Sequence, residues 1–578
     1  MRIQRSFLIV CGLCVLVAGT VSAAPTRPTQ APHVMVASIH ELASRAGVDM
    51  LLSGGNAVDA AVATGFALAV VYPEAGNLGG GGFLLLRNAN GKVHFIDFRE
   101  KAPAAATENM YLDAAGNVLP ESNKESSVVG YRSIGVPGTV AGLIYAEKQY
   151  GKLSIEKVMA PAIKLARDGF RLAAQDAQDL RDDQYLAQFP ESKRIFLRNG
   201  NYYQPGDLFK QPELAHTLQR LAKDPDTFYH GAMARELAAA IQKGGGLVTA
   251  KDLAAYEIKE REPIRGSYRG YDIISAPPPS SGGVALIEIL NILEGFDLAR
   301  LGNRSPETIH LEAEAFRRAF YDRADFMGDP DFAKIPVAQL IDKKYAAAWR
   351  DSIDLNRASV SKDLKRPSFN ELERVAQSRP AAIREPQNTT HYSIVDADGN
   401  AVSVTTTLND SFGSRVTAEG LGFLLNDEMD DFAAKQGVPN TYGLIQGPAN
   451  AIGPGKRPLS AMTPTIVLKD GKLFLVLGSP GGPTIITTVA NILIGVVDFS
   501  LNIQEAVDAL RFHHQWLPDQ IVVEDGVSPA TMNVLQSKGH KVKVDPLWGD
   551  GECIMVDPKT GERLGASDGR NNGKAVGY

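Results

Sequence analysis

The sequence Asn388-Thr389-Thr390-His391-Tyr392-Ser393, which continues as IVDADGNAVSVTTTLND, decides how we interpret the rest of the chain. A polar segment with prolines, SRPAAIREPQN, leads into a threonine, and a hairpin with alternating apolar residues and an Asp-Gly turn follows. A threonine exposed at a new chain terminus can use its own α-amine as the base, so it needs no histidine relay to act as a nucleophile. The alternative, a strand-opening threonine that only packs or forms hydrogen bonds, is the usual fate of an arbitrary Thr-Thr pair.

The composition is that of a folded protein that acts on small molecules. Of the 578 residues 44% are hydrophobic and 22% are charged, and the formal net charge is -6. The chain is long enough for several packed layers. The mildly acidic balance, together with the lack of a Lys- and Arg-rich cluster in the sequence, argues against nucleic acid as a partner.

The first 23 residues have the pattern of a secretory signal peptide. Arg2 and Arg5 form a positive region, residues 7–18 are apolar, and Val21-Ser22-Ala23 is a small-residue cleavage site. The apolar run is shorter than the roughly 20 residues that a membrane helix needs. We therefore expect cleavage after residues 1–23 and secretion, in the periplasm, with no membrane span in the mature chain.

Cysteine usage limits how the mature protein is stabilised. Cys11 and Cys14 lie inside the predicted signal, so its removal leaves only Cys553. A single cysteine cannot form an internal disulfide, even in an oxidising compartment. Stability must then come from a large core.

Before Thr389 the sequence predicts mainly helices. Asn56 and Asp59 have the spacing of a helix cap, and the alanine-rich segment behind them ends at Pro73. Strands are expected from Gly79 onward and at KVHFIDFRE, and the four glycines at 79–82 indicate close backbone packing, since no Lys-Ser/Thr of a phosphate loop follows. IRGSYRGYDIIS is predicted as one strand, and residues 361–388 as a tail or linker. The other predicted helices span residues 39–52, 138–150, 155–168, 214–223, 232–242, 284–293 and 306–327.

After Thr389 the pattern changes to strands. Three hairpin signatures, two with Asp-Gly turns, lie in HYSIVDADGNAVSVTTT, PTIVLKDGKLFLVLGSP and ECIMVDPKTGERLGAS, and helices are expected at residues 487–499 and 503–511. Helices that need a sheet to cover predict an α+β fold, with helices layered on antiparallel sheets. The change from helix-rich to strand-rich sequence falls at Thr389.

Several motifs in this order resemble the γ-glutamyltranspeptidase family, also called glutathione hydrolases. They are DFREKAP around Arg99, NTTHYS, Thr407-Leu408-Asn409, NDEMDDF at 426–432, KRPLSAMTPT from Lys456, GSPGG from Gly478 and RFHHQWLPD from Arg511. The resemblance covers essentially the whole mature chain. It implies the four-layer αββα sandwich of N-terminal nucleophile hydrolases and a precursor that cuts itself between Asn388 and Thr389. The large subunit would be 24–388 and the small subunit 389–578, and the two would form a heterodimer.

The same resemblance implies an acyl-transfer reaction without a cofactor. Thr389 Oγ would attack the γ-carbonyl of glutathione or another γ-glutamyl compound, and the γ-glutamyl ester would pass to water or to an amino acid or dipeptide acceptor. The implied catalytic residues are Thr389, Thr407 and the oxyanion-hole glycines Gly481 and Gly482. The implied substrate-binding residues are Arg99, Asn409, Glu428, Asp431, Ser460, Ala461 and the lid residue Tyr442.

One position departs from the family. Many relatives have two serines where this chain has Ser460-Ala461. Ala461 offers only its backbone, so one side-chain hydrogen bond to the substrate carboxylate, on the order of 1 kcal/mol, would be missing. We expect weaker substrate binding or altered selectivity at this position.

Three histidines suggest other mechanisms, but their spacing does not favour a metal. His513 and His514 are adjacent, and on a strand they point to opposite faces, which is poor metal geometry. We expect these two and His391 to be structural, and we expect no metal.

Two alternatives to γ-glutamyl transfer stay open. One is an amidase for another acyl group on the same scaffold, such as a glutaryl β-lactam acylase or a polyglutamate-cleaving enzyme. The other is a non-catalytic exported binding protein, which would keep the precursor intact.

Overall fold

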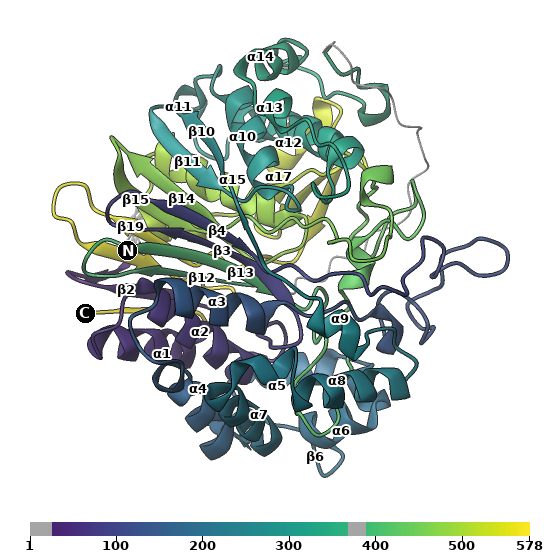
Figure 1. Ribbon diagram of the computed structural model, residues 1–578. Coiled ribbons are helices and arrows are strands. Elements are labelled where there is room, and N and C mark those ends of the chain that lie inside the picture. Colours follow the sequence, from purple (N-terminus) through teal and green to yellow (C-terminus); the bar gives the residue numbers. More distant parts are fainter. Residues whose placement is uncertain (1–25, 368–388) are drawn as a thin grey trace, which may run out of the picture.

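A computed structural model describes residues 26–367 and 389–578. The predicted signal peptide and most of the predicted linker therefore lie outside the described residues, and so does Asn388. Two seven-stranded antiparallel sheets are stacked face to face, and helices cover the outer face of each (Figure 1). This layer order confirms the predicted αββα sandwich.

The first sheet holds Thr389 in its middle, and we call it the Thr389 sheet. Thr389 is the first residue of β12 and stands directly opposite Thr407, the last residue of β13. Thr407 in turn pairs with Gly81 on β3. The strands in spatial order are β21 (Lys574–Gly577), β2 (Met35–Ser38), β12 (Thr389–Val395), β13 (Ala401–Thr407), β3 (Gly81–Arg87), β4 (Val93–Asp97) and β9 (Lys259–Arg261).

The second sheet packs on the inner face of the Thr389 sheet. Apolar side chains that alternate along each strand fill the space between the two sheets, for example Phe83 and Leu85 from one and Val476 from the other. The second sheet has the strands β1 (Thr29–Ala31), β20 (Arg563–Ala566), β19 (Cys553–Val556), β15 (Lys472–Leu477), β14 (Thr465–Lys469), β11 (Tyr271–Ser275) and β10 (Ile264–Tyr268).

The first helical layer covers the Thr389 sheet. Leu84 and Leu86, which alternate with the residues facing the second sheet, pack against these helices. The alanine-rich α2 is buried along its whole length, and Asn56 and Asp59 form the predicted capping box at its start. The layer contains α1 (Glu41–Leu52), α2 (Ala57–Val71), α3 (Thr139–Tyr150), α4 (Ile155–Asp168), α5 (Ala174–Asp182), α6 (Pro190–Phe196), α7 (Pro212–Lys223), α8 (Ala232–Lys243) and α9 (Ala250–Ala254).

The second helical layer covers the other sheet. Its apolar core joins α10, α12 and α15 to residues on the outer face of the second sheet, such as Leu475 and Leu477. The helices are α10 (Gly282–Leu293), α11 (Leu298–Leu301), α12 (Pro306–Phe326), α13 (Val337–Leu340), α14 (Lys343–Asp351), α15 (Thr484–Val497), α16 (Ile503–Asp508) and α17 (Pro529–Ser537). Short strands form three small sheets: β16 (Phe512–His513), β17 (Ile521–Glu524) and β18 (Val542–Asp545); β5 (Phe170–Arg171) with β8 (Leu208–Phe209); and β6 (Leu197–Arg198) with β7 (Asn201–Tyr202).

One feature of the fold was not foreseen from the sequence, and one expectation needs correction. The chain before Thr389 is not separated in space from the chain after it, because it supplies β2, β3, β4 and β9 to one sheet and β1, β10 and β11 to the other. IRGSYRGYDIIS forms two strands, not one. Arg269 and Gly270 both have positive φ, as a tight two-residue hairpin turn requires, so β10 folds back on β11.

No helix within the described residues is long and apolar enough to cross a membrane. Cys553 is a free, buried thiol on β19. Its burial raises the pKa of the thiol well above the usual value.

Candidate active site

Thr389 and Thr407 meet at the open end of the β12–β13 hairpin. Both are buried, with Thr389 only 5% exposed, and their hydroxyl oxygens are 3.4 Å apart. Thr407 Oγ accepts a hydrogen bond of 2.8 Å from the backbone N–H of Asn409. The Thr407 hydroxyl is therefore held in place beside the Thr389 hydroxyl.

The glycines at 79–82 bring the neighbouring chain unusually close to this pair. A Cβ on Gly80 would collide with the carbonyl oxygen of Thr407, and one on Gly82 with that of Thr405. The same Thr407 carbonyl accepts a 2.9 Å hydrogen bond from Asn77 Nδ2. The glycine run thus serves the close backbone packing expected from the sequence and fixes the position of Thr407.

Arg99 follows β4 and is completely buried beside three carboxylates. Its guanidinium donates to Glu428 and Asp431, and Glu100 Oε2 lies 3.6 Å from Nη1. Nη2 also donates to the carbonyl of Leu459 at 3.1 Å. Burial by itself would lower the pKa of Arg99, but the three acids outweigh it and raise the pKa above its usual value. Arg99 is therefore a permanent cation at the centre of an acidic group.

The acids around Arg99 are not equivalent. Burial raises the pKa of Glu100 to about 7, although Arg99 opposes the shift. Burial also raises the pKa of Glu428 well above its usual value, again against the effect of Arg99. Asp431 is the most exposed of the three, with its side chain 15% exposed. A positively charged ligand group would reach Asp431 most easily.

Most of the predicted residues line one cavity. Its volume is about 20 Å³, enough for one or two water molecules and far too small for a γ-glutamyl group. Gly481 is not among the lining residues, although it adjoins Gly482. The predicted residues that do line the cavity are Arg99, Thr389, Thr407, Asn409, Glu428, Asp431, Tyr442, Ser460, Ala461 and Gly482.

Tyr442 lines this cavity beside the loop that holds Gly481 and Gly482. Its hydroxyl donates to the backbone carbonyl of Asn409 at 2.8 Å, and a Cβ on Gly482 would lie 3.0 Å from its ring. The Tyr442 ring is thus held between the segment of Asn409 and the loop of Gly482. Tyr442 is therefore placed to cover a ligand bound in the cavity.

The two loop glycines have backbone conformations that favour glycine. φ is +131° at Gly481 and +52° at Gly482. Their carbonyls accept hydrogen bonds from Thr484 N–H at 2.9 Å and Ile485 N–H at 3.2 Å, so the loop runs directly into the start of α15. The positive end of a helix dipole at this position favours negative charge in the cavity.

The histidines lie in the core and have local partners. His391 is bonded to Thr405 at 2.9 Å and to Ser393 at 3.1 Å, and burial lowers its pKa to about 3. His513 contacts Thr487 at 2.9 Å, whereas His514 lies 3.5 Å from Asp519. His513 ends β16 and His514 lies just beyond it, and the two histidines have different partners.

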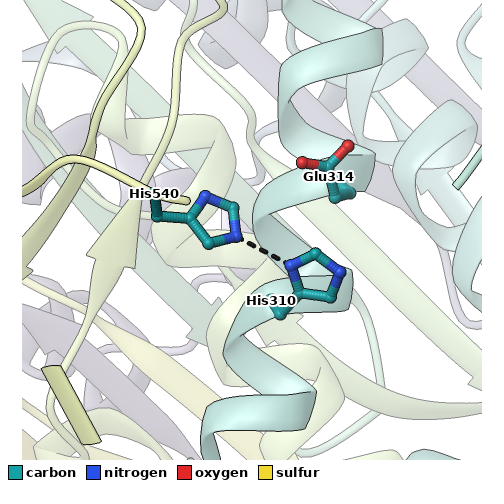
Figure 2. A group of neighbouring side chains, drawn as sticks. All are labelled: His310, Glu314 and His540. Carbon is teal, nitrogen blue, oxygen red and sulfur yellow. Dashed lines mark hydrogen bonds between the residues drawn. The ribbon is translucent and has the colours of Figure 1, made fainter. Parts of the chain in front are cut away.

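One group of ligand-type side chains lies away from the cavity, and Figure 2 shows it. Ligand atoms of His310, Glu314 and His540 lie within 4.8 Å of one another, and the two histidines form a 2.7 Å hydrogen bond. Glu314 accepts a 2.6 Å bond from Arg318 and lies 3.3 Å from Arg317. Two guanidinium groups beside the only carboxylate would repel a cation, so we interpret this group as a structural hydrogen-bond network.

Sequence reasoning missed part of the cavity wall. Arg323 on α12 lines it, yet an arginine in an amphipathic helix carries no signal that distinguishes it from a solvent-facing one. The other missed residues are apolar and belong to segments next to predicted ones: Leu444, Met462, Pro483 and Ile485.

The chain has two stacked antiparallel sheets between helical layers, and a threonine hydroxyl at the first position of a central strand faces a polar cavity. This combination defines an N-terminal nucleophile hydrolase. The model of the family described as gamma-glutamyltranspeptidase matches residues 43–578. The chain belongs to this γ-glutamyltranspeptidase family, whose members are made as a proenzyme that is processed into two subunits.

Individual relatives support the same family assignment. A protein of Escherichia coli strain K12 named glutathione hydrolase proenzyme is 50% identical over 549 residues, covering 94% of this chain and 91% of that protein. An acylase ACY 1 proenzyme of Pseudomonas sp. strain SE83 is 36% identical over 557 residues, covering 95% and 94%. The crystal structure of a cephalosporin acylase from Bacillus halodurans matches with a TM-score of 0.80 at 27% identity, covering 98% and 99% of the two chains.

Proposed function

We propose that this protein is a self-cleaving γ-glutamyltransferase and glutathione hydrolase with Thr389 as its nucleophile. The observation that carries the proposal is the position of Thr389. Its hydroxyl lies at the start of β12, beside Thr407, in the cavity whose wall holds the Arg99, Glu428 and Asp431 ion pairs. The family and the glutathione hydrolase relatives support the reaction.

Processing comes first. Thr389 Oγ attacks the carbonyl carbon of Asn388, and the acyl group moves from the Thr389 nitrogen to its oxygen. Water hydrolyses this ester and leaves a large subunit, 24–388, and a small subunit, 389–578, as a heterodimer. The freed α-amine has an ordinary pKa of about 7.7 to 8.0, which suits a general base near neutral pH.

The substrate head group suits the charges of the cavity. An α-amino acid head is zwitterionic, so it enters an already paired cluster without changing the net charge. Its ammonium group binds Glu428 and Asp431 with help from Asn409, and its carboxylate binds Arg99 and Ser460. Tyr442 then covers the bound head group.

Acyl transfer then takes place at Thr389. Its oxygen attacks the γ-carbonyl carbon while the α-amine takes the hydroxyl proton. The backbone N–H groups of Gly481 and Gly482 stabilise the oxyanion. The C–N bond breaks, the departing amine of Cys-Gly takes the proton, and water or the amine of an amino acid or dipeptide resolves the γ-glutamyl ester. The N-terminal sequence supports export to the periplasm as the place of this reaction.

Two measurements test this function. We expect the purified protein to give two bands in denaturing electrophoresis and to release p-nitroaniline from γ-glutamyl-p-nitroanilide, faster when glycylglycine is added. Thr389→Ala should remain one uncleaved, inactive chain, whereas Thr390→Val, whose buried hydroxyl has no hydrogen-bond partner in the described structure, should be cleaved and active. A processed or active Thr389→Ala would mean that another residue is the nucleophile.

The acylase relatives favour one second candidate, hydrolysis of a glutaryl amide. A glutaryl group has the same carboxylate but lacks the α-amine, so it has no ammonium group for Glu428 and Asp431 to bind. We therefore expect glutaryl-p-nitroanilide to be the poorer substrate. Faster turnover of the glutaryl compound would favour the acylase activity.

A further inference from the structure

A second cavity lies beside α3 in the first helical layer, and we call it the α3 pocket. It is lined by residues of α3, by residues of the segment 225–230 and by Tyr256 and Ile258. Its volume is about 240 Å³, and it shares no lining residue with the catalytic cavity. A protein cavity of about 150 Å³ is large enough to hold benzene. The α3 pocket therefore has room for one aromatic ring with a short side chain.

The floor of the α3 pocket is apolar and aromatic. Four buried residues form it, each at most 7% exposed: Val140, Ile144, Tyr229 and Tyr256. The rings of Tyr229 and Tyr256 are stacked, with their centroids 5.5 Å apart and an angle of 20° between the ring planes. Aromatic side chains of this kind pack well against a flat apolar ligand.

Both tyrosine hydroxyls are already bonded to the backbone. Tyr229 Oη donates to the carbonyl of Pro137 at 3.0 Å and accepts from the N–H of Ala141 at 3.1 Å. Tyr256 Oη donates to the carbonyl of Arg99 at 2.9 Å. The two rings are therefore fixed before a ligand arrives, so binding requires little ordering of the pocket wall. Since their polar groups are engaged, the floor favours a hydrocarbon ring.

The rim of the α3 pocket carries charge. Lys148, Asp226 and His230 line the pocket and are exposed. Asp226 lies 3.9 Å from His230, whereas the ammonium group of Lys148 has no hydrogen-bond or ion-pair partner within residues 26–367 and 389–578. Lys101 Nζ lies 5.7 Å from the centroid of the Tyr256 ring, so a cationic ligand would be repelled there. The charges around the pocket therefore favour an anionic group.

We propose that the α3 pocket is a binding site for an aromatic carboxylate. The ring of the ligand lies against Tyr229 and Tyr256, and its carboxylate pairs with Lys148. Such a ligand needs neither a γ-glutamyl group nor an amine, so it differs in chemistry from the donors and acceptors that react at Thr389. The proposal does not depend on the proposed function.

Two small probes test the site on the purified protein. 3-Phenylpropionate has one ring and a carboxylate, and 3-phenylpropionamide has the same shape without the charge. Binding is followed by ligand-observed NMR titration. We expect a Kd of about 1 mM for the acid, as for a ligand of this size, and a Kd about threefold to fivefold higher for the amide, because an exposed ion pair contributes only modestly. A lack of saturable binding of the acid up to about 10 mM would overturn the proposal.

Lys148→Gln removes the cation at the rim and leaves the floor intact. It should weaken binding of the acid to the level of the amide, and the Kd of the amide should not change. Lys164→Gln on α4 is the matched control, because Lys164 is also exposed but does not line the pocket. This control should bind both probes as the wild type does. Wild-type affinity for the acid in Lys148→Gln would show that the carboxylate does not bind where we propose.

Ala141→Phe fills the α3 pocket with a ring of its own. Ala141 lines the pocket, and the hydrogen bond from its backbone N–H to Tyr229 does not depend on its side chain. The folded variant should bind neither probe. If it binds 3-phenylpropionate as tightly as the wild type, the probe occupies another part of the protein and the proposal is wrong.

A crystal structure of the wild-type protein with 3-phenylpropionate needs no variant. Ring atoms of the probe should lie within about 4.5 Å of Tyr229 or Tyr256, with the carboxylate toward Lys148. A probe bound only in the catalytic cavity would overturn the proposal.

Discussion

Thr389 and Thr407 are directly opposed across the β12–β13 pair, with their hydroxyl oxygens 3.4 Å apart. Directly opposed residues of an antiparallel pair place their side chains on the same face of the sheet. The separation is longer than an ordinary hydroxyl–hydroxyl hydrogen bond. The strand pairing holds the two side chains in position, and a small shift would shorten the distance between their hydroxyl oxygens to that of a good hydrogen bond.

We expect Thr407→Val to slow both processing and turnover, with kcat reduced about tenfold. Valine keeps the shape of threonine but removes the oxygen that accepts the Asn409 N–H, and loss of such a bond costs about 1 to 3 kcal/mol. Processing is followed by denaturing electrophoresis and kcat by p-nitroaniline release. Thr407→Ser keeps the hydroxyl and should retain most activity. A processed Thr407→Val with unchanged kcat would show that this hydroxyl does not assist Thr389.

Asp431→Asn should be processed normally but should lose about 30-fold or more in kcat/KM for γ-glutamyl-p-nitroanilide. Asparagine has the same size but cannot neutralise the substrate ammonium group, and losing one partner of a buried charge pair costs at least about 2 kcal/mol. Glutaryl-p-nitroanilide has no ammonium group, so its turnover should fall less.

The neighbouring acid provides the control for Asp431. Asp430 accepts a 2.6 Å hydrogen bond from Ser127 and is not among the residues that line the cavity. Asp430→Asn should therefore leave the preference for γ-glutamyl over glutaryl donors unchanged. If both variants alter this preference equally, the assignment of Asp431 to the ammonium group is wrong.

Gly482→Ala should reduce kcat about 100-fold, within the range seen when one oxyanion-hole donor is lost. φ at Gly482 is +52°, and the added Cβ would lie 3.0 Å from the Tyr442 ring, so both the loop and the lid residue must shift. Gly471→Ala is the control, because Gly471 has φ of +74° in the β14–β15 turn but open space around it. Both variants should lower Tm, and only Gly482→Ala should lose activity. Wild-type kcat in Gly482→Ala would argue against the oxyanion role.

Local signals in the sequence predicted much of the fold. Asn56 and Asp59 cap α2 as expected, and the Asp-Gly turns mark hairpins correctly, because these signals depend on a few neighbouring residues. The Arg269-Gly270 turn was missed because arginine seldom adopts positive φ. The exchange of strands between the two parts of the chain was also missed, since pairing such as β2 with β12 is not a local property.

The candidate site also has one part that local sequence signals predicted and another part that they did not. Thr389 could be singled out from its own strand, but the meeting of Arg99 with Glu428 and Asp431 joins residues more than 300 positions apart. Only the resemblance to a known family predicted that meeting. Arg323 was missed altogether, because its place in the cavity depends on how α12 packs beside the segment of Ser460 through Ser281.

Ala461→Ser tests what the departure from the family does in this chain. Ala461 lines the cavity and is 8% exposed, whereas the hydroxyl of Ser460 already accepts a 3.1 Å hydrogen bond from the N–H of Met462. A second hydroxyl would add one hydrogen bond to the α-carboxylate, about 1 kcal/mol, so KM for γ-glutamyl-p-nitroanilide should fall about fivefold. KM for 4-aminobutyryl-p-nitroanilide, which lacks the carboxylate, should not change. Equal effects on both donors would show that position 461 acts on the shape of the cavity and not on the carboxylate.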